Sequence, residues 1–271
     1  MLDTAAVADS PSALKCWQGV GFAMSQAHRH DDIEVNLVDD QPLTYLFGGR
    51  LVEIQPGEVG LFWAAVPHRL IDCPQNWSTR VSWLHVPLPI ALGWPLPEGA
   101  LSSLLAGVPL ISRNAEYPAA AEFRRWSVDL DGGFADVALL EIQAGVRRLL
   151  QHARPAGSEP RTDGTLQHVV TMARFIMRHS AEPITAAAVA RAAHLHPNYA
   201  MTLFRQVVGV TMHTYLVQRR VAEAQRLLLA TDRTIGQVAG AAGFGSQSGF
   251  YETFVRSCGQ APGEYRRRHR G

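Results

Sequence analysis

Residues 235–256 have the sequence IGQVAGAAGFGSQSGFYETFVR, and this stretch decides the fold of the C-terminal half. A short helical pattern is followed by a glycine-containing turn and a second helical pattern. Ser246 can cap the second helix, and Phe250 and Phe254 lie one turn apart on its buried side. Small residues, Ala239 among them, allow the two helices to cross closely. The stretch therefore predicts a helix-turn-helix.

A first copy of this pattern lies about 50 residues earlier, where residues 184–209 have the sequence ITAAAVARAAHLHPNYAMTLFRQVVG. Thr185 can cap its first helix, and Pro197 suits the first turn of its second helix. Gly209 can end that helix. The duplication predicts two helix-turn-helix units in an almost wholly helical region.

A long amphipathic helix over residues 211–229 is expected to join the two units. Its apolar positions are Val217, Val221, Ala224 and Leu228, which recur at helical spacing. Such a helix spans roughly 28 Å at about 1.5 Å per residue, which approaches one DNA turn of about 34 Å. Two reading helices could therefore enter successive major grooves of one duplex.

Over about residues 166–268 the chain resembles the AraC/XylS-type bacterial transcription regulators. The resemblance rests on Tyr215, Leu216, Arg220, Val221, Ala224, Leu227 and Leu228 in the joining helix, on Ile235, Val238, Ala239, Gly243, Phe244, Ser246, Phe250 and Phe254 in the second unit, and on Gly259, Gln260, Ala261, Pro262, Tyr265 and Arg266 after it. So many elements in order are highly specific. One departure, His194 where the family often has glycine, concerns the detail of the first turn.

The resemblance implies that the second helix of each unit enters a DNA groove. The implied contact residues are Asn198, Met201, Thr202 and Arg205 in the first unit, and Gln247, Ser248, Tyr251, Glu252 and Arg256 in the second. Asparagine and glutamine can pair with adenine, arginine with guanine, and Met or Thr can touch a thymine methyl. Arg205 and Arg256 could equally be phosphate contacts. For any single residue the alternative is a solvated helix face.

The N-terminal half has a different pattern, with short β-rich runs between turn residues. Runs at 33–38, 43–47, 50–54, 59–63 and 80–86 predict strands of an all-β sandwich or barrel, with Gly48-Gly49 as a two-residue hairpin turn. From about residue 95 the pattern becomes helical. Residues 153–165 are rich in Pro, Gly, Ser and charged residues, which indicates a linker.

A cluster of polar residues follows from the pattern H-x-H-x3-E at His28, His30 and Glu34. In an extended segment these side chains share one face. A second stretch, from Gly57 to His68, resembles the second motif of cupin barrels, although Trp63 and Ala65 replace the usual proline and glycine and Gln41 departs from the first motif.

The cupin resemblance makes His28, His30, Glu34 and His68 the candidate ligand-binding residues. In metal cupins such a set would hold Fe, Ni, Mn or Zn. A metal-free pocket for a small polar molecule, and a solvated face with no binding role, are the alternatives, so the metal is left unknown and no cofactor is assigned.

The expected fold is a two-domain α+β protein. A cupin-like ligand-sensing barrel over 1–94 precedes a helical dimerisation or relay segment over 95–152, a linker over 153–165 and an all-α double helix-turn-helix domain over 166–271. Leu139, Ile142, Val146 and Leu149 form an apolar stripe in the helical segment. That stripe could pack on its own barrel, form a dimer contact, or do both.

Charge separates the two halves. Residues 1–160 carry a net charge of −7 and residues 161–271 carry +8, which suggests that only the C-terminal half meets a polyanion. Three scattered cysteines, Cys16, Cys73 and Cys258, predict neither a disulfide framework nor a cysteine zinc site. No membrane-length apolar run and no secretory signal pattern are found, so a cytoplasmic protein without membrane contact is expected.

The function expected from these features is a sequence-specific, DNA-binding transcription regulator, an activator rather than a repressor. Its expected partners are double-stranded promoter DNA, a small-molecule effector such as a sugar, RNA polymerase and a second copy of the chain. A metal-dependent cupin enzyme fused to a DNA-binding domain is the alternative. A third class is a constitutive architectural protein whose N-terminal half only dimerises.

Overall fold

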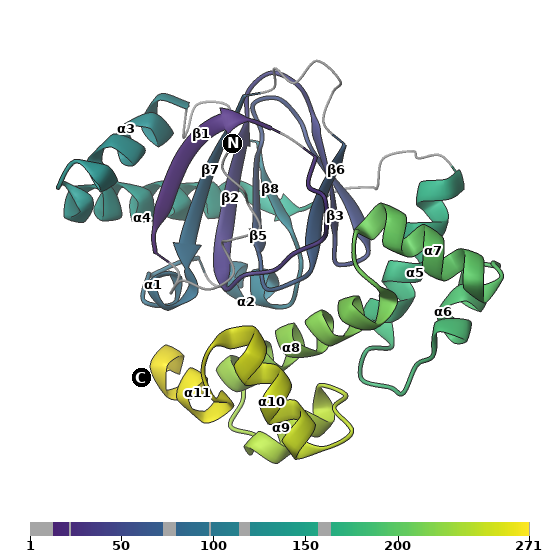
Figure 1. The fold of residues 1–271 in the computed structure, drawn as a ribbon. Coiled ribbons are helices and arrows are strands. Elements are labelled where there is room, and N and C mark those ends of the chain that lie inside the picture. Colours follow the sequence, from purple (N-terminus) through teal and green to yellow (C-terminus); the bar gives the residue numbers. More distant parts are fainter. Residues whose placement is uncertain are drawn as a thin grey trace.

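The structure is a computed structural model that describes residues 13–21, 23–72, 80–97, 99–113, 120–156 and 164–270. Figure 1 shows an N-terminal half built on β-sheet and a C-terminal half built on helices. This mixed architecture confirms the predicted order of the two halves. No helix in the described ranges combines the length and the apolar character that a membrane span needs.

Two antiparallel sheets form the N-terminal half. The larger sheet has the strand order β1-β7-β2-β5-β8-β9, and the smaller sheet has the order β4-β3-β6. The strands are β1 (Lys15–Val20), β2 (Asp32–Val38), β3 (Leu43–Phe47), β4 (Arg50–Ile54), β5 (Val59–Trp63), β6 (His68–Asp72), β7 (Arg80–Pro87), β8 (Leu110–Ser112) and β9 (Ala153–Pro155).

The described strands do not close into the barrel that the sequence predicts. Within the described ranges, the pairing between the two sheets is a single bridge between His28 and His68. A barrel needs continuous pairing around its whole circumference. Here β6 meets a segment that is extended at His28 but becomes a ladder strand only at Asp32. The observed arrangement is two sheets that share one core.

The hairpin between β3 and β4 is a feature that the sequence predicted correctly. Phe47 pairs with Arg50, so Gly48 and Gly49 form a two-residue turn. Both glycines have positive φ values, +53° and +77°, which side-chain-bearing residues adopt only with strain. At Gly49 a Cβ atom would also lie 2.6 Å from the backbone nitrogen of Arg174, so the turn packs closely against the C-terminal half.

Where the structure describes this half, four helices accompany the sheets: α1 (Leu88–Leu92), α2 (Ala100–Leu105), α3 (Ala120–Asp131) and α4 (Ala135–His152). Figure 1 shows α3 beside the β1 edge of the larger sheet and α4 running behind that sheet. Ile142, Val146 and Leu149 of the predicted stripe are buried in the core of the N-terminal half, and Leu139 is half-buried. The stripe therefore packs on its own sheets.

The described residues of the C-terminal half form seven helices: α5 (Gly164–Arg178), α6 (Ala186–Ala192), α7 (Pro197–Val208), α8 (Met212–Ala230), α9 (Ile235–Ala241), α10 (Gln247–Cys258) and α11 (Pro262–Arg270). Thr185 and Ser246 cap α6 and α10 through their side chains, as expected. Thr234 and Gln237 form a capping box at α9. These signals place α6–α7 and α9–α10 as the two helix-turn-helix units, joined by α8.

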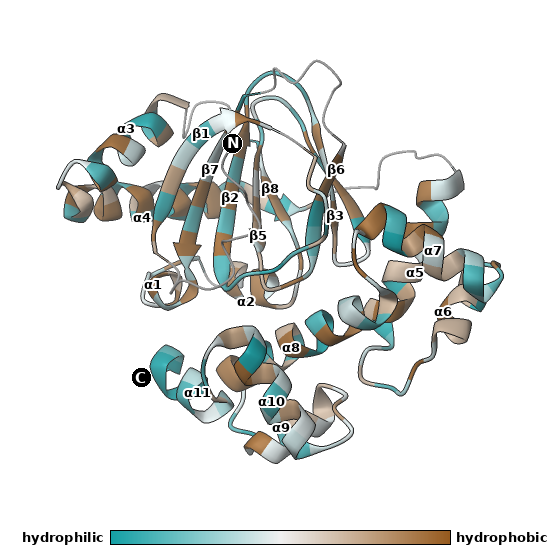
Figure 2. Ribbon diagram, in the orientation of Figure 1, coloured by the Kyte–Doolittle hydropathy of each residue, from teal (hydrophilic) through white to brown (hydrophobic). Residues whose placement is uncertain are grey.

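The first helix-turn-helix unit shares its hydrophobic core with the smaller sheet. Leu46 of β3 and Leu51 of β4 are buried among Val170, Phe204 and Tyr215 of the helical half. Figure 2 shows apolar colouring on β3 and α5 and hydrophilic colouring at the end of α11. The two halves are thus in direct apolar contact.

The junction between the halves departs from a plain linker. Ala153–Pro155 forms β9, which pairs with β8, and α5 begins at Gly164. Of the predicted linker over 153–165, residues 157–163 lie outside the described residues and residues 164–165 already belong to α5. The proposed domain boundaries stay a prediction.

Candidate functional site

The outer face of α7 carries the first predicted set of DNA contacts. Asn198, Met201, Thr202 and Arg205 are all exposed. The opposite face of the helix holds Ala200, Leu203, Phe204 and Val208, which are buried. This division leaves the predicted contact residues free to meet a DNA groove.

The outer face of α10 carries the second set. Gln247, Ser248, Glu252 and Arg256 are exposed, whereas the ring of Tyr251 is half-buried against Phe250, with ring centroids 6.0 Å apart. Phe250 and Phe254 fix the helix from inside. Tyr251 is therefore the residue of this set whose side chain is partly covered.

Two further side chains on these faces were not identified from the sequence. Tyr199 on α7 and Val255 on α10 are 56% and 42% exposed. In a helix that enters a DNA groove, exposed side chains of this kind suit contact with thymine methyl groups. Their helical spacing from the predicted residues was the signal that could have found them.

The joining helix α8 fixes both units. Arg220 of α8 donates from Nε to the carbonyl of Ser180 at 2.8 Å and from Nη2 to that of Glu182 at 2.9 Å, both ahead of α6. At the other end, Arg266 of α11 donates to the carbonyls of Leu228 and Arg233. These contacts hold the segment before α6, and α11, against α8 and the loop that follows it.

The four predicted ligand-binding residues come together between the sheets. His28, His30, Glu34 and His68 offer ligand atoms that all lie within 4.8 Å of one another. Glu34 Oε1 is 2.6 Å from His30 Nε2 and 3.2 Å from His68 Nε2. The side chains of Glu34 and His68 are almost fully buried.

Two neighbours of this cluster were not identified as part of it. His85 of β7 stands opposite Glu34 of β2, with its Nε2 3.5 Å from Glu34 Oε1. Asp32 Oδ2 lies 2.9 Å from His30 Nδ1 and 3.6 Å from His85 Nδ1. His30, Asp32 and His85 thus form a second group able to hold an ion.

Burial and mutual charge set the protonation of the cluster. Burial opposes the charge of Glu34, but His68, His85 and His30 outweigh it and hold its pKa well below 4.5. Burial also opposes the His30 cation, yet hydrogen bonds to Asp32 and Glu34 raise its pKa to about 9. Burial, with other histidines nearby, lowers the pKa of His28 to about 3; burial lowers that of His85 to about 4. At neutral pH His28 and His85 are therefore neutral, whereas His30 is a cation beside the Glu34 carboxylate.

This donor set fits a transition-metal ion. Three imidazoles and one carboxylate are ligands typical of Fe, Ni, Mn and Zn, and His68 Nδ1 lies 3.0 Å from the carbonyl of Val66, which orients the ring. Asp32 Oδ1 and Asn36 Oδ1 are buried without a hydrogen-bond partner among the described residues. Buried polar atoms of this kind favour a bound group beside them.

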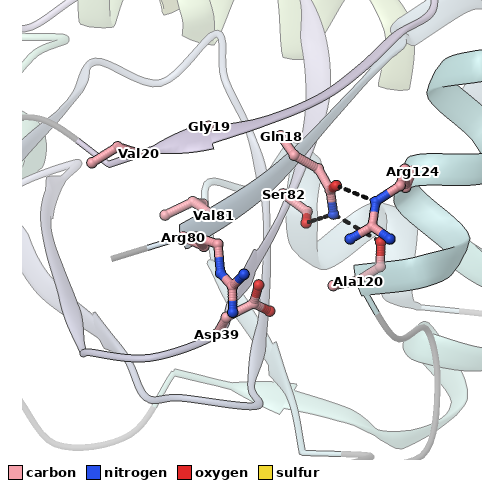
Figure 3. Close-up of a pocket in the computed structure, with 9 residues that line it drawn as sticks. All are labelled: Gln18, Gly19, Val20, Asp39, Arg80, Val81, Ser82, Ala120 and Arg124. Carbon is pink, nitrogen blue, oxygen red and sulfur yellow. Dashed lines mark hydrogen bonds between the residues drawn. The ribbon is translucent and has the colours of Figure 1, made fainter. Parts of the chain in front are cut away.

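A separate pocket of about 340 Å³ opens beside β1, β7 and α3 (Figure 3). Gln18 spans it, donating from Nε2 to Ser82 Oγ at 2.9 Å and to the carbonyl of Ala120 at 2.8 Å. Arg124 Nε donates to Gln18 Oε1 at 3.4 Å. These groups bond to one another, and the pocket contains none of the predicted ligand-binding residues.

Two helix-turn-helix units with exposed outer faces, fixed by one joining helix, define a DNA-binding transcription regulator. A family model described as a helix-turn-helix domain matches residues 189–268. The melibiose operon regulatory protein of Escherichia coli strain K12 is 30% identical over 257 residues, which are 90% of this chain and 84% of that protein. The chain belongs to the AraC family of transcription regulators.

Other relatives match smaller parts. The RCS-specific transcriptional activator RclR of Escherichia coli strain K12 is 25% identical over 77% of this chain and 63% of its own length. Among solved structures, the DNA-binding domain of AdpA in complex with a target DNA is 28% identical, with a TM-score of 0.36 over 40% of this chain and 95% of that chain.

Proposed function

We propose that this regulator reads promoter DNA with α7 and α10 in successive major grooves, under the control of an effector bound at the histidine cluster. The observation that carries the DNA-reading part is the exposure of the predicted contacts on both helices while their apolar faces are buried. The length of α8, about 28 Å at about 1.5 Å per residue, suits reading heads about one DNA turn apart.

The effector is a small polar molecule, with a sugar as the first candidate. Support comes from the buried polar atoms of the cluster, which would hydrogen-bond hydroxyl groups. A relative that shares 84% of its length with this chain is named for the melibiose operon. A divalent metal ion is the second candidate, favoured by ligand atoms within 4.8 Å of one another.

Thermal unfolding tests the effector site. Mono- and disaccharides, and Co²⁺, Ni²⁺, Mn²⁺ and Zn²⁺, are each added to the full chain, because a ligand of the folded state raises the melting temperature by mass action. His68→Gln should abolish the shift, whereas His152→Gln, an exposed histidine of α4, should keep it. A shift that survives in His68→Gln would place the effector elsewhere.

Selection of DNA from a random pool by the full chain tests the reading function. We expect one enriched sequence with two half-sites about one DNA turn apart. Enrichment of a single half-site would mean that only one unit reads bases. A pool that stays random would remove the assignment of both helices.

The protein acts on promoters as a homodimer that activates transcription through contact with RNA polymerase. The proposed dimer face is formed by Val128 of α3, Phe134 in the turn before α4, and Val137 and Leu140 of α4, whose exposed fractions are 64%, 61%, 43% and 67%. Asp136 near the start of α4 and Arg147 near its end would face each other in an antiparallel pair of helices. Charge complementarity therefore supports a second copy as the occupant.

Sedimentation velocity tests the dimer. Leu140→Glu should shift the full chain to monomer, while Gln151→Glu, exposed on the same helix, should not. A dimer that persists in Leu140→Glu would place the contact on another face.

Promoter-reporter expression in cells that lack the protein tests the sign of regulation. If the protein is an activator, expression from its target promoter should fall when the protein is removed.

A further inference from the structure

Residues 27–31, which we name the strap, connect the effector cluster with the DNA-binding half. His28 and His30 point into the cluster. The residues between and after them, Arg29 and Asp31, contact α8 and α11 instead. The contacts alternate along the segment, up to the bend at Asp31, so one short stretch serves both sites.

Arg29 contacts the joining helix. Its Nε donates to the carbonyl of Ala65 at 3.2 Å, and its Nη2 donates to Gln225 Oε1 in α8. Gln225 is fully buried and passes the contact on, since its Nε2 donates to the hydroxyl of Tyr265 at 3.1 Å. Arg29 thus reaches α11 through one intermediate side chain.

Asp31 contacts α11 directly. Its Oδ2 accepts a hydrogen bond from the Tyr265 hydroxyl at 2.6 Å and lies 3.7 Å from His269 Nε2. Its Oδ1 accepts a bond from Trp63 Nε1 of β5 at 3.3 Å. Tyr265 in turn belongs to the core of the second helix-turn-helix unit, where it packs edge-on against Phe254.

The two helix-turn-helix units are attached to the sheets in different ways. The first unit shares an apolar core with Ala27, Leu46 and Leu51, and the carbonyl of Val208 accepts a bond from the backbone of Ala27 at 2.7 Å. The described core of the second unit contains residues of the C-terminal half alone. The polar contacts of Arg29 and Asp31 therefore form a separate attachment for the second unit.

We propose that Arg29, Asp31, Gln225 and Tyr265 form an interdomain lock through which occupancy of the histidine cluster controls the position of the second helix-turn-helix unit. The inference rests on the proposed function for its biological meaning. A bound effector changes the positions of the His28 and His30 side chains. The backbone of the strap moves with them and displaces Arg29 and Asp31 from their partners in α8 and α11. Binding linkage is reciprocal: the factor by which the effector changes DNA affinity is also the factor by which bound DNA changes effector affinity.

Hydrogen–deuterium exchange of the full chain tests the lock without DNA or effector. Glu34→Gln perturbs the cluster while keeping the shape of the side chain, and Tyr265→Phe keeps the ring but removes the lock hydroxyl. Each variant should raise exchange of α10 and α11 amides by at least about fivefold, with α7 unchanged. The double variant should match Tyr265→Phe alone, because the lock is already open.

A matched control separates coupling from general loosening. Glu141→Gln removes a carboxylate that accepts bonds from Arg125 and Trp126 in the N-terminal half, away from the strap. It should leave α10 and α11 unchanged. If Glu34→Gln does not fold, His28→Gln replaces it as the cluster variant.

Three outcomes would overturn the lock: no change of α10 and α11 in the cluster variant, simple addition of the two effects, or the same response in Glu141→Gln. Failure of the proposed function is seen separately, as absence of a DNA sequence selected by the wild-type chain. The two failures are therefore distinguishable.

Discussion

At the scale of the residue, the turns of the two helix-turn-helix units have the same left-handed backbone conformation at matching positions, although the residues there differ. His194 has φ of +56° and is the non-glycine residue of the described chain with positive φ, while Gly243 has φ of +88° at the matching place. The amides of Leu195 and Phe244 donate to Ala190 and Ala239 in the same pattern. The departure noted at His194 therefore leaves a left-handed residue in the turn.

This geometry predicts opposite effects of two substitutions. His194→Gly should relieve about 1–3 kcal/mol of left-handed backbone strain, partly offset by the roughly 0.5–1 kcal/mol of entropy that glycine adds to the unfolded chain, so a small net stabilisation is expected. Gly243→Ala should destabilise it by about 1–3 kcal/mol, because a Cβ would lie 2.5 Å from the carbonyl oxygen of Ser180. Urea unfolding of both variants measures the difference. Equal effects would contradict the argument.

Base reading by Gln247 gives a second residue-scale prediction. Gln247→Ala should cost about 1–3 kcal/mol at one base pair of the selected site and relax the preference there. Arg256→Ala should instead weaken all sequences equally if it contacts phosphate. Fluorescence anisotropy with single-base variants of the site distinguishes the two patterns. A uniform loss for Gln247→Ala would make it a backbone contact.

The histidine cluster shows which parts of a site sequence reasoning can reach. His28, His30 and Glu34 were predictable because they alternate within one stretch, and His68 followed from motif spacing. His85 was missed because its place beside Glu34 depends on the pairing of β2 with β7, about 50 residues apart. No local pattern reports that register. The contacts of Arg29 and Asp31 with α8 and α11 were hidden for the same reason.

At the scale of the element, α8 combines a buried side with a charged one. Glu223 lies between Arg219, at 3.1 Å, and Arg226, with which it forms a second ion pair. Burial opposes the charge of Glu223, but hydrogen bonding and charge from Arg226 and Arg219 lower its pKa below 4.5. The triad therefore adds to the stability of the helix that separates the two reading heads.

The sign of this effect can be tested by pH. A carboxyl whose pKa is lower in the folded state stabilises the protein fully above its unfolded pKa, near 4.5, and loses that contribution as pH falls through the folded pKa. Glu223→Gln should cost about 1 kcal/mol at pH 7 and converge with wild type in acid. Thermal unfolding between pH 7 and pH 3 measures this. A constant difference would exclude the charge as its cause.

Elements were predicted well where local signals agree. The caps at Thr185 and Ser246 and the Gly48-Gly49 turn lie where the sequence indicated. The closed barrel was wrong because closure depends on pairing between distant edges, and only the His28–His68 bridge joins the two described sheets. Capping is local chemistry, whereas sheet closure is a property of the assembled half.

At the scale of the whole molecule, charge is divided between the halves. The C-terminal part, residues 161–271, carries +8 against −7 for the rest. A basic domain that neutralises phosphates releases counterions, so DNA affinity of the full chain should fall steeply with salt. Titrations at several salt concentrations measure the slope. Affinity independent of salt would contradict the electrostatic part of the proposal.

The leucines of the β3–β4 hairpin have a consequence for how such chains can be recombined. Leu46 and Leu51 complete the interior of the first helix-turn-helix unit from outside it. A chimaera that grafts residues 164–271 onto a foreign sensor would lack these two side chains. The apolar residues of the helical half that they cover would then be exposed to solvent. A functional chimaera should therefore keep the β3–β4 hairpin together with the helix-turn-helix domain. For the same reason we expect the two halves to be retained together when such genes recombine.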